Sequence, residues 1–202
     1  NASYLSNVYS SAIELGEYST FNINDRNISL YENSYLYICP TCDLDVSTYA
    51  LINDTTYIRA EGNLSVGLDN FDTLGGTIWT NSSINLFYKI ENITVIYAGG
   101  EFTIVDNNLT IGNLSTLQFE TDQALNFSSI ILEAGGMITH TTNYNTKLYI
   151  VNISAENFTI DNGGNITADS LGYALENGPG PGTNGSQISS SYVGGGGGRN
   201  SQ

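Results

Sequence analysis

The heptapeptide AGGMITH at residues 134–140 is one of four similar segments that decide the fold expected for this chain. Each segment has a Gly-Gly pair, one variable residue, an apolar residue and then a polar or aromatic one. The others are LGGTIWT at 74–80, AGGEFTI at 98–104 and NGGNITA at 162–168, with degenerate copies in EGNLSV at 61–66 and IGNLST at 111–116. The Gly-Gly pairs begin 24, 36 and 28 residues apart. Such spacings are typical of a solenoid whose coils each contribute short stacked strands, and glycine permits the positive φ of a corner between strands.

The residues around these repeats alternate between apolar and polar and are rich in β-branched and aromatic side chains. Examples are NISLYENSYLYI at 27–38, ITVIYAGGEFTIV at 93–105 and KLYIVNI at 147–153. No window of comparable length has a helical period, so the chain is predicted to be all-β. We expect a right-handed parallel β-helix with a Gly-rich C-terminal loop. A β-sandwich of hairpins is the alternative, although two-residue Asn-Gly and Asp-Gly turns are few.

The pattern divides the chain into three regions. Residues 1–55 are expected to form N-terminal strands or a cap with a Cys-x-x-Cys loop, and residues 56–168 the coils of the β-helix. Residues 169–202 are rich in Gly, Pro and Ser, and by composition alone they would form a flexible linker. Because this region stops in GGGGGRNSQ without a closing element, we expect it to continue in a longer chain.

A motif at the start of the third region resembles a known family. Its parts are Ile166, Ala168, Asp169, Gly172 and Tyr173, followed by GPGPG at 178–182 and GGGGG at 194–198. They resemble the Ile-x-Ala-(Asp/Asn)-Gly-x-Gly-Tyr, Gly-Pro-Gly and poly-Gly segment of secreted, glycine-rich parallel β-helix (pectin-lyase-like) proteins of protist and plant cell surfaces. Ser170 and Leu171 depart from that Gly-x spacing. The resemblance implies a parallel β-helix and a Gly-rich run that packs along it as an ordered loop.

The composition excludes two classes of partner. Only 12% of the residues are charged, about half the usual share. Five Lys and Arg against 20 Asp and Glu give a net charge of -15, which argues against nucleic acid and against an anionic membrane surface. The chain begins at Asn1, without a basic n-region or an apolar run long enough to span a membrane. We therefore expect a mature or excised segment of a secreted chain, located outside the cell or on its surface and not inserted in a membrane.

The chain contains many Asn-x-Ser/Thr triplets, the acceptor sequons for N-glycosylation. Thirteen of its 25 Asn residues begin one, more than its Ser and Thr content gives by chance. In nine of the thirteen the middle residue is apolar, and in a strand such a triplet puts Asn and Ser/Thr on the outer face and the apolar residue inside. In NFTIDNGGNIT at 157–167, for example, Phe158, Ile160 and Ile166 are predicted to point inward, with Gly163-Gly164 at the corner. The candidate glycosylation sites are Asn1, Asn27, Asn53, Asn63, Asn81, Asn92, Asn108, Asn113, Asn126, Asn152, Asn157, Asn165 and Asn184.

The most specific motif for a reactive site in this sequence is Cys39-Pro40-Thr41-Cys42. A Cys-x-x-Cys can be a redox dithiol at a helix N-terminus, but the LDVSTYALI that follows it indicates a strand. A zinc site needs four ligands, and the chain has only two Cys and one His. In an oxidising compartment we expect a local disulfide that closes a tight loop.

We do not expect an enzyme, although Asp69 and Asp72, or Asp43 and Asp45, could supply an acid/base pair for glycoside cleavage. No cofactor is expected beyond covalent N-glycans. The basic residues and His140 share no register, and the paired-Asp and Gly-His-Gly signatures of polygalacturonases are absent. Two acidic loops leave a weak possibility of bound Ca²⁺, with candidate ligands Asp43, Asp45, Asp69 and Asp72. Loop Asp residues are more often turn formers.

Two functions follow from these features. The first is a heavily N-glycosylated extracellular structural protein, a subunit or segment of a surface filament, appendage or coat that self-associates by head-to-tail contacts. The second is a cell-surface adhesin or carbohydrate-binding module, in which some of the 14 Tyr residues stack on sugars. The sugar coat expected on the outer faces leaves little bare surface for a partner, so we rank the structural protein first.

Overall fold

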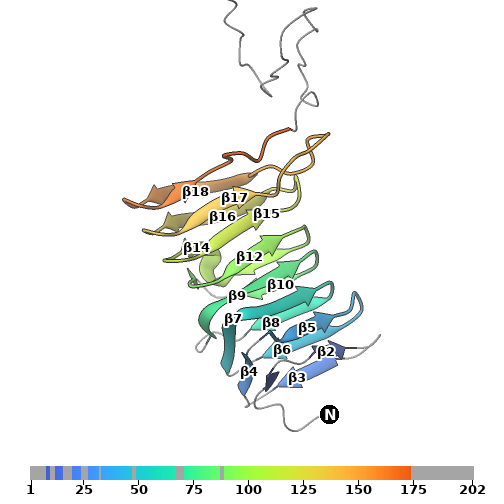
Figure 1. Ribbon diagram of the computed structural model, residues 1–202. Coiled ribbons are helices and arrows are strands. Elements are labelled where there is room, and N and C mark those ends of the chain that lie inside the picture. Colours follow the sequence, from blue (N-terminus) through green and yellow to red (C-terminus); the bar gives the residue numbers. More distant parts are fainter. Residues whose placement is uncertain are drawn as a thin grey trace, which may run out of the picture.

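The structure is a computed structural model that describes residues 8–9, 12–15, 20–23, 27–31, 33–46, 49–66, 71–86 and 89–173. These residues form a column of stacked strands with one short 3-10 turn, η1 (Figure 1). No helix in the described ranges is long and apolar enough to cross a membrane. The elements are β1 Val8–Tyr9, β2 Ala12–Leu15, β3 Thr20–Ile23, β4 Asn27–Tyr31, β5 Tyr35–Ile38, β6 Asp43–Val46, β7 Tyr49–Ala60, β8 Asn63–Val66, β9 Phe71–Thr80, β10 Ile84–Leu86, β11 Lys89–Ile90, β12 Thr94–Tyr97, β13 Phe102–Ile104, η1 Val105–Asn107, β14 Asn108–Ile111, β15 Thr116–Phe119, β16 Leu125–Leu132, β17 Met137–His140, β18 Ile153–Ile160 and β19 Asn165–Ile166.

The strands lie on three faces of the column. Face A contains β2, β5, residues 57–60 of β7, residues 77–80 of β9, β12, β15, β17 and β19. Face B contains β3, β6, β8, β10 and β13, and face C contains β11, β14, β16 and β18. Successive face A strands pair through one row of partners, from Tyr35 to Tyr57, Thr77, Thr94, Thr116, Met137 and Asn165.

Every strand pair in the described residues is parallel. The chain therefore returns to the same face one coil later, which confirms the predicted parallel β-helix; its hand stays a prediction. The β-sandwich alternative is wrong, because a sandwich built from hairpins needs antiparallel neighbours. The Gly-rich C-terminal segment was predicted for residues 169–202, of which residues 174–202 lie outside the described residues.

The core is the inside of the column, and it consists of apolar side chains stacked in register. One such row runs along face A from β5 to β17, and its six members are all buried: Leu36, Ile58, Ile78, Val95, Leu117 and Ile138. The alternation predicted from sequence produces this row, because every second side chain of each strand points inward. β7 crosses the boundary expected at residue 55, so the first two regions share one sheet.

The Gly-Gly pairs mark corners of the column, but not all the same corner. Gly75, Gly135 and Gly163 precede or begin face A segments and have positive φ, as predicted. Gly99 follows β12 and belongs to the next corner, between faces A and B. The repeat inferred from sequence therefore mixes two corners, which explains its uneven 24- and 36-residue spacings.

Small hydroxyl residues occupy the first of these corners in other coils, a feature missed from the sequence. Thr56 and Ser115, each directly before a face A segment, are buried. The Thr56 hydroxyl donates a hydrogen bond to the Leu30 carbonyl at 3.3 Å, and the Ser115 hydroxyl to the Ile90 carbonyl at 3.1 Å. Glycine is thus one of several small residues that fit this corner, and here the others also satisfy a buried carbonyl.

Candidate glycan-bearing surface

The sequon Asn residues lie on the outside of the column wherever their side chains are described. Seven are exposed, at positions 63, 81, 108, 113, 126, 157 and 165. Asn92 and Asn152 are half-buried. Asn27 and Asn53 lie in β4 and β7 with only their backbone described, and Asn1 and Asn184 lie outside the described residues. None of the nine described side chains is buried, as attachment of a bulky glycan requires.

The predicted anchoring of the triplet by its middle residue holds for four of the eight apolar middle residues whose side chains are described. Leu64, Ile93, Leu109 and Phe127 are all buried, and each directly follows a sequon Asn. In β8, β14 and β16 the Asn before this residue is exposed. The strand alternation therefore holds these acceptors in solvent while their neighbours pack in the core.

The triplet Asn113-Leu114-Ser115 is an exception that corrects the prediction. Leu114 is 74% exposed with a φ of 54°, while Ser115 is buried. The triplet lies at the corner between β14 and β15, where the period-2 alternation of a strand does not apply.

The C-terminal coil supplies a second correction. Phe158 pairs with buried Ile130, Ile160 with Leu132 and Ile166 with Ile138, so their register is the predicted one. They are nevertheless 39%, 50% and 42% exposed, because no described coil lies above them. Their inward direction does not by itself produce burial.

The acceptors are unevenly distributed over the three faces. Asn63 lies on face B, and Asn108 and Asn157 lie on face C in one row with Ser129 between them. From β5 to β15 the strands of face A carry no sequon Asn; the nearest, Asn81, Asn92 and Asn113, lie at the corners. A glycan coat would thus cover faces B and C and flank face A.

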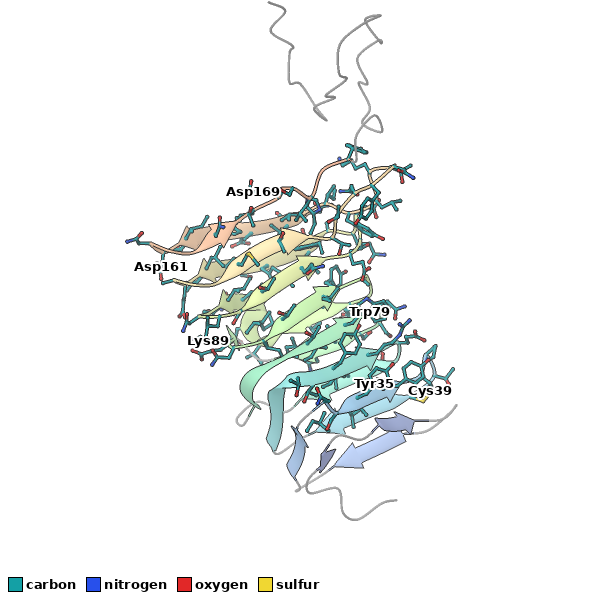
Figure 2. The ribbon with its side chains drawn as sticks, in the orientation of Figure 1. Tyr35, Cys39, Trp79, Lys89, Asp161 and Asp169 are labelled. Atoms are coloured by element: carbon teal, nitrogen blue, oxygen red, sulfur yellow. A yellow bond between two sulfur atoms is a disulfide. The ribbon has the colours of Figure 1, made fainter. Side chains whose placement is uncertain are left out.

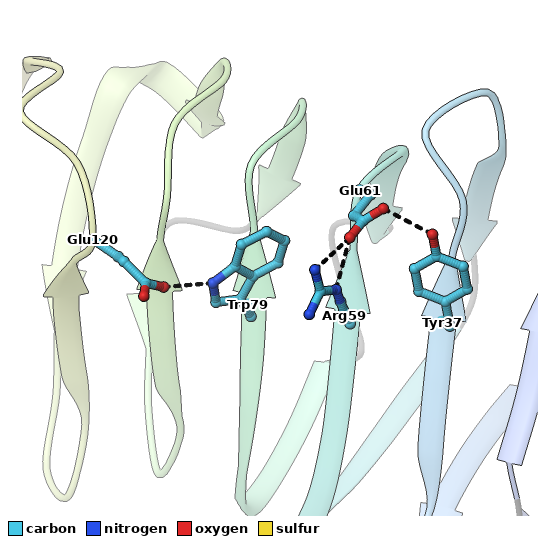
Figure 3. A network of polar contacts seen from close by, with 5 residues as sticks. All are labelled: Tyr37, Arg59, Glu61, Trp79 and Glu120. Atoms are coloured by element: carbon cyan, nitrogen blue, oxygen red, sulfur yellow. Dashed lines mark hydrogen bonds and ion pairs between the residues drawn. The ribbon is translucent and has the colours of Figure 1, made fainter. Parts of the chain in front are cut away.

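Face A carries a ladder of aromatic and charged side chains instead (Figure 3). The Tyr37 hydroxyl donates to Glu61 at 2.8 Å, and Arg59 Nε donates to the other oxygen of Glu61 at 2.8 Å. The Arg59 guanidinium lies 4.6 Å from the centre of the Trp79 ring, and Trp79 Nε1 donates to Glu120 at 2.6 Å. Five side chains from four coils are joined in this way, and the coil of β12 lies between those of Trp79 and Glu120.

The contacts of the ladder shift the pKa values of its acid and its phenol in opposite directions. Hydrogen bonds from Tyr37 and then Arg59 lower the pKa of Glu61. The hydrogen bond to Glu61 raises the pKa of Tyr37, and the same carboxylate raises the pKa of Arg59. Each shift favours the protonation state in which the hydrogen bonds form.

The aromatic rings of face A cover one another. Tyr35 and Tyr57 stack at 5.9 Å with an angle of 6° between the rings, and Arg59 covers one face of Trp79. All four side chains are half-buried, and they come from the neighbouring strands β5, β7 and β9. Figure 2 labels Tyr35 and Trp79, which lie on the first and last of these strands. Sugar rings bind by stacking on an open aromatic face, so the ring faces that these contacts cover are closed to a sugar. The pattern Tyr35-x-Tyr37, Tyr57-x-Arg59 and Thr77-x-Trp79 is the sequence signal that could have revealed the ladder.

Glu61→Gln is expected to reduce the loss of stability in acid. Because the folded pKa of Glu61 is lowered, its contribution is present above the unfolded pKa and is lost as the pH falls through the folded pKa. The ladder is near solvent, so we expect a difference of only about 0.5–1 kcal/mol. Urea unfolding of both proteins at pH 7 and pH 3 measures it. Glu156→Gln, an exposed carboxylate, is the control; an equal change in both variants would contradict the assignment.

Cys39 and Cys42 form a disulfide, as predicted. Both residues are buried and lie in the turn between β5 and β6, where the Cys42 amide donates to the Cys39 carbonyl at 2.9 Å. A strand follows Cys42, whereas the reactive cysteine of a redox dithiol lies at the N-terminus of a helix. The structure therefore does not support a redox dithiol.

The calcium candidates are only partly described. Asp43 and Asp45 lie half-buried on β6, and Asp43 accepts a 2.6 Å hydrogen bond from the Asn63 amide. The side chain of Asp72 and all of Asp69 lie outside the described parts. Within those parts no cluster of three or more His, Cys, Asp or Glu side chains could hold a metal ion.

Two of the basic residues are paired with carboxylates. Arg59 contacts Glu61, and Lys89 contacts Glu133 at 3.0 Å and Glu91 at 3.4 Å. The hydrogen bond to Glu133 raises the pKa of Lys89. His140 Nδ1 lies 2.8 Å from the Thr141 carbonyl. These groups are thus not gathered into one site for an acidic sugar.

Comparison with protein-family models, with curated proteins and with solved structures gives no match.

Proposed function

We propose that this chain is a heavily N-glycosylated extracellular structural protein, a subunit or segment of a surface filament, appendage or coat. The observation that carries the proposal is the placement of the sequons: none of the nine described acceptor side chains is buried. Since only 12% of the residues are charged, another group must keep the surface in solution. N-glycans are bulky and solubilising, and they supply that group.

The column geometry supports a structural role and head-to-tail assembly. Each coil contacts its neighbours through parallel strand pairs, so the two ends carry strand edges. β1, β2 and β3 each pair with one described strand at the N-terminal end, and β18 and β19 do so at the other. Contacts between unlike ends do not close into a ring unless the rotation allows it, and otherwise give filaments.

Glycopeptide mass spectrometry of native material is the first test. We expect glycans on the exposed acceptors of faces B and C, including Asn63, Asn108, Asn126 and Asn157. Thr110→Ala removes the Asn108 sequon and keeps its Asn, so the glycan should disappear from that peptide alone. Ser129→Ala, in the same row but outside any sequon, is the matched control. Unmodified Asn at all four positions would refute the proposal.

Electron microscopy of native material tests the assembly separately. We expect filaments or sheets whose long axis follows the column, with extra density over faces B and C. Enzymatic removal of the glycans should then lower solubility, because it exposes a charge-poor surface. Dispersed monomers at high concentration would overturn the assembly and leave the glycoprotein assignment to the mass spectra.

A further inference from the structure

The residues that directly follow the face A strands form a row of their own along one corner of the column. Glu61, Asn81, Ala98, Glu120 and Thr141 occupy this corner row. The backbone amide of each donates to the carbonyl of a face A residue in the preceding coil. One residue per coil therefore stacks in register at this corner, and the candidate acceptor Asn81 is one of them.

The acidic side chains of the corner row bend back over face A. The Glu61 carboxylate accepts from Arg59 Nε at 2.8 Å, and Arg59 lies two residues before it. The Glu120 carboxylate accepts from Trp79 Nε1 at 2.6 Å, two coils away (Figure 3). Asn81 lies between these two carboxylates in the row. A group attached to Asn81 therefore begins beside the same part of face A.

The only indole of the chain lies on the same side of its strand, two residues before Asn81. Thr80 between them is fully buried, whereas Asn81 is exposed and Trp79 half-buried. Residues two apart in a strand point to the same side and are about 7 Å apart. Arg59 lies against one face of the Trp79 ring, and no other cation and no aromatic ring contacts it among the described side chains. The indole is thus within reach of a sugar on Asn81.

Two further features suit a sugar at this position. The next residue of the corner row is Ala98, whose side chain is only a methyl group. The second carboxylate oxygen of Glu120 has no partner in the described residues and can accept a hydrogen bond. A sugar ring has an apolar face that stacks on an aromatic ring, and hydroxyl groups that donate to a carboxylate.

We propose that the N-acetylglucosamine attached to Asn81 stacks on the ring of Trp79 and donates a hydroxyl hydrogen bond to Glu120. This inference rests on the proposed glycosylation and adds to it a binding site for one particular glycan. Arg59 and Glu120 hold the indole in place as the platform. The glycan then lies over the edge of face A instead of extending into solvent.

Tryptophan fluorescence tests the contact, because Trp79 is the only Trp in the chain. The full chain is secreted from a eukaryotic host that attaches N-glycans. Ser83→Ala removes the Asn81 sequon and keeps its Asn. The indole should then be more open to water, so we expect emission at longer wavelength and an increase of about twofold in quenching by acrylamide.

Two matched controls separate the effect of the glycan from that of the substitution. Ser82→Ala changes the neighbouring serine and keeps the Asn81 sequon. Thr110→Ala removes a glycan on face C instead. Both should keep the emission and the quenching of the parent. An endoglycosidase that leaves one sugar on each Asn should also keep them, because the first sugar makes the contact.

Mass spectrometry of the Asn81 glycopeptide, taken on the same samples, separates the outcomes. A glycan on Asn81 with equal emission in the parent and in Ser83→Ala would overturn the contact and leave the glycoprotein assignment intact. An unmodified Asn81 in a chain that carries glycans elsewhere would also overturn it. Unmodified Asn both here and at the four acceptors named for faces B and C would refute the two proposals together.

Proton NMR of the Asn81 glycan supplies an independent readout. The ring current of the indole should move the sugar protons that face it upfield in the parent. Trp79→Leu removes the ring and should abolish this shift. Tyr57→Leu removes another outward ring of face A and is the matched control, so the shift should remain. Unshifted sugar protons in the parent would contradict the stacking.

Discussion

Phe119→Ala is expected to destabilise the column by about 3–5 kcal/mol, the usual cost of removing a buried aromatic side chain. Phe119 is fully buried, and its ring meets that of Tyr97 edge to face at 5.9 Å. Tyr97 meets Phe102 in the same way, and Phe102 meets Phe127. Because Tyr97 and Phe102 belong to one coil and Phe119 and Phe127 to the next, a cavity at Phe119 removes contacts between these two coils.

Urea or thermal unfolding of Phe119→Ala measures this loss. Tyr144→Ala is the matched control, since Tyr144 is largely exposed in the loop between β17 and β18. It removes a similar ring, and its stability should stay within about 0.5 kcal/mol of the parent. A cost for Phe119→Ala no greater than that of Tyr144→Ala would show that the stacked rings do not support the column.

Gly62→Ala is expected to cost about 3 kcal/mol, the upper end of the range for overpacking. A Cβ atom at Gly62 would lie 2.2 Å from the carbonyl oxygens of both Cys39 and Cys42. The disulfide closes this turn, and the Gly62 amide donates to the Ile38 carbonyl at 3.2 Å. The neighbouring backbone therefore has little freedom to move away from an added methyl group.

Gly172→Ala is the matched control for Gly62→Ala. No heavy atom lies within 4 Å of a Cβ added at Gly172, and its φ is not in the left-handed region. We expect no loss of stability there, and a small gain is consistent with lower entropy of the unfolded chain. Equal midpoints for the two variants would contradict the close stacking of Gly62 on the disulfide turn.

The sequence predicted the fold because the information for it is local. Strands of a half-buried sheet need alternation, and the alternation is visible in segments such as ITVIYAGGEFTIV and NISLYENSYLYI. The strand predicted from KLYIVNI at 147–153 is wrong, because β18 begins only at its last residue, Ile153. The disulfide was equally local, since Cys39 and Cys42 are only three positions apart in the sequence. The register of the Gly-Gly pairs could not be read in the same way, because Gly99 and Gly75 look alike in sequence and occupy different corners.

The candidate site also combines features that local sequence predicts with features that it does not. The outward direction of Asn63, Asn108 and Asn126 follows from the alternation within their own strands. The ladder that joins Tyr37, Glu61, Arg59, Trp79 and Glu120 does not, because Trp79 and Glu120 are 41 residues apart. Their contact depends on the number of residues in each intervening coil.

The sequence by itself determined that apolar and polar residues alternate along the chain, that the chain turns at small residues and that the Asn acceptors face outward. Each of these properties depends on a few consecutive residues. Only the tertiary structure decided which coils are neighbours, which corner each Gly-Gly pair occupies and that the face A strands from β5 to β15 carry no acceptor. It also showed that the inward side chains of β18 lack a cover in the described residues. Coil length sets these relations, and coil length is fixed only when parallel strands far apart in the chain pair in register.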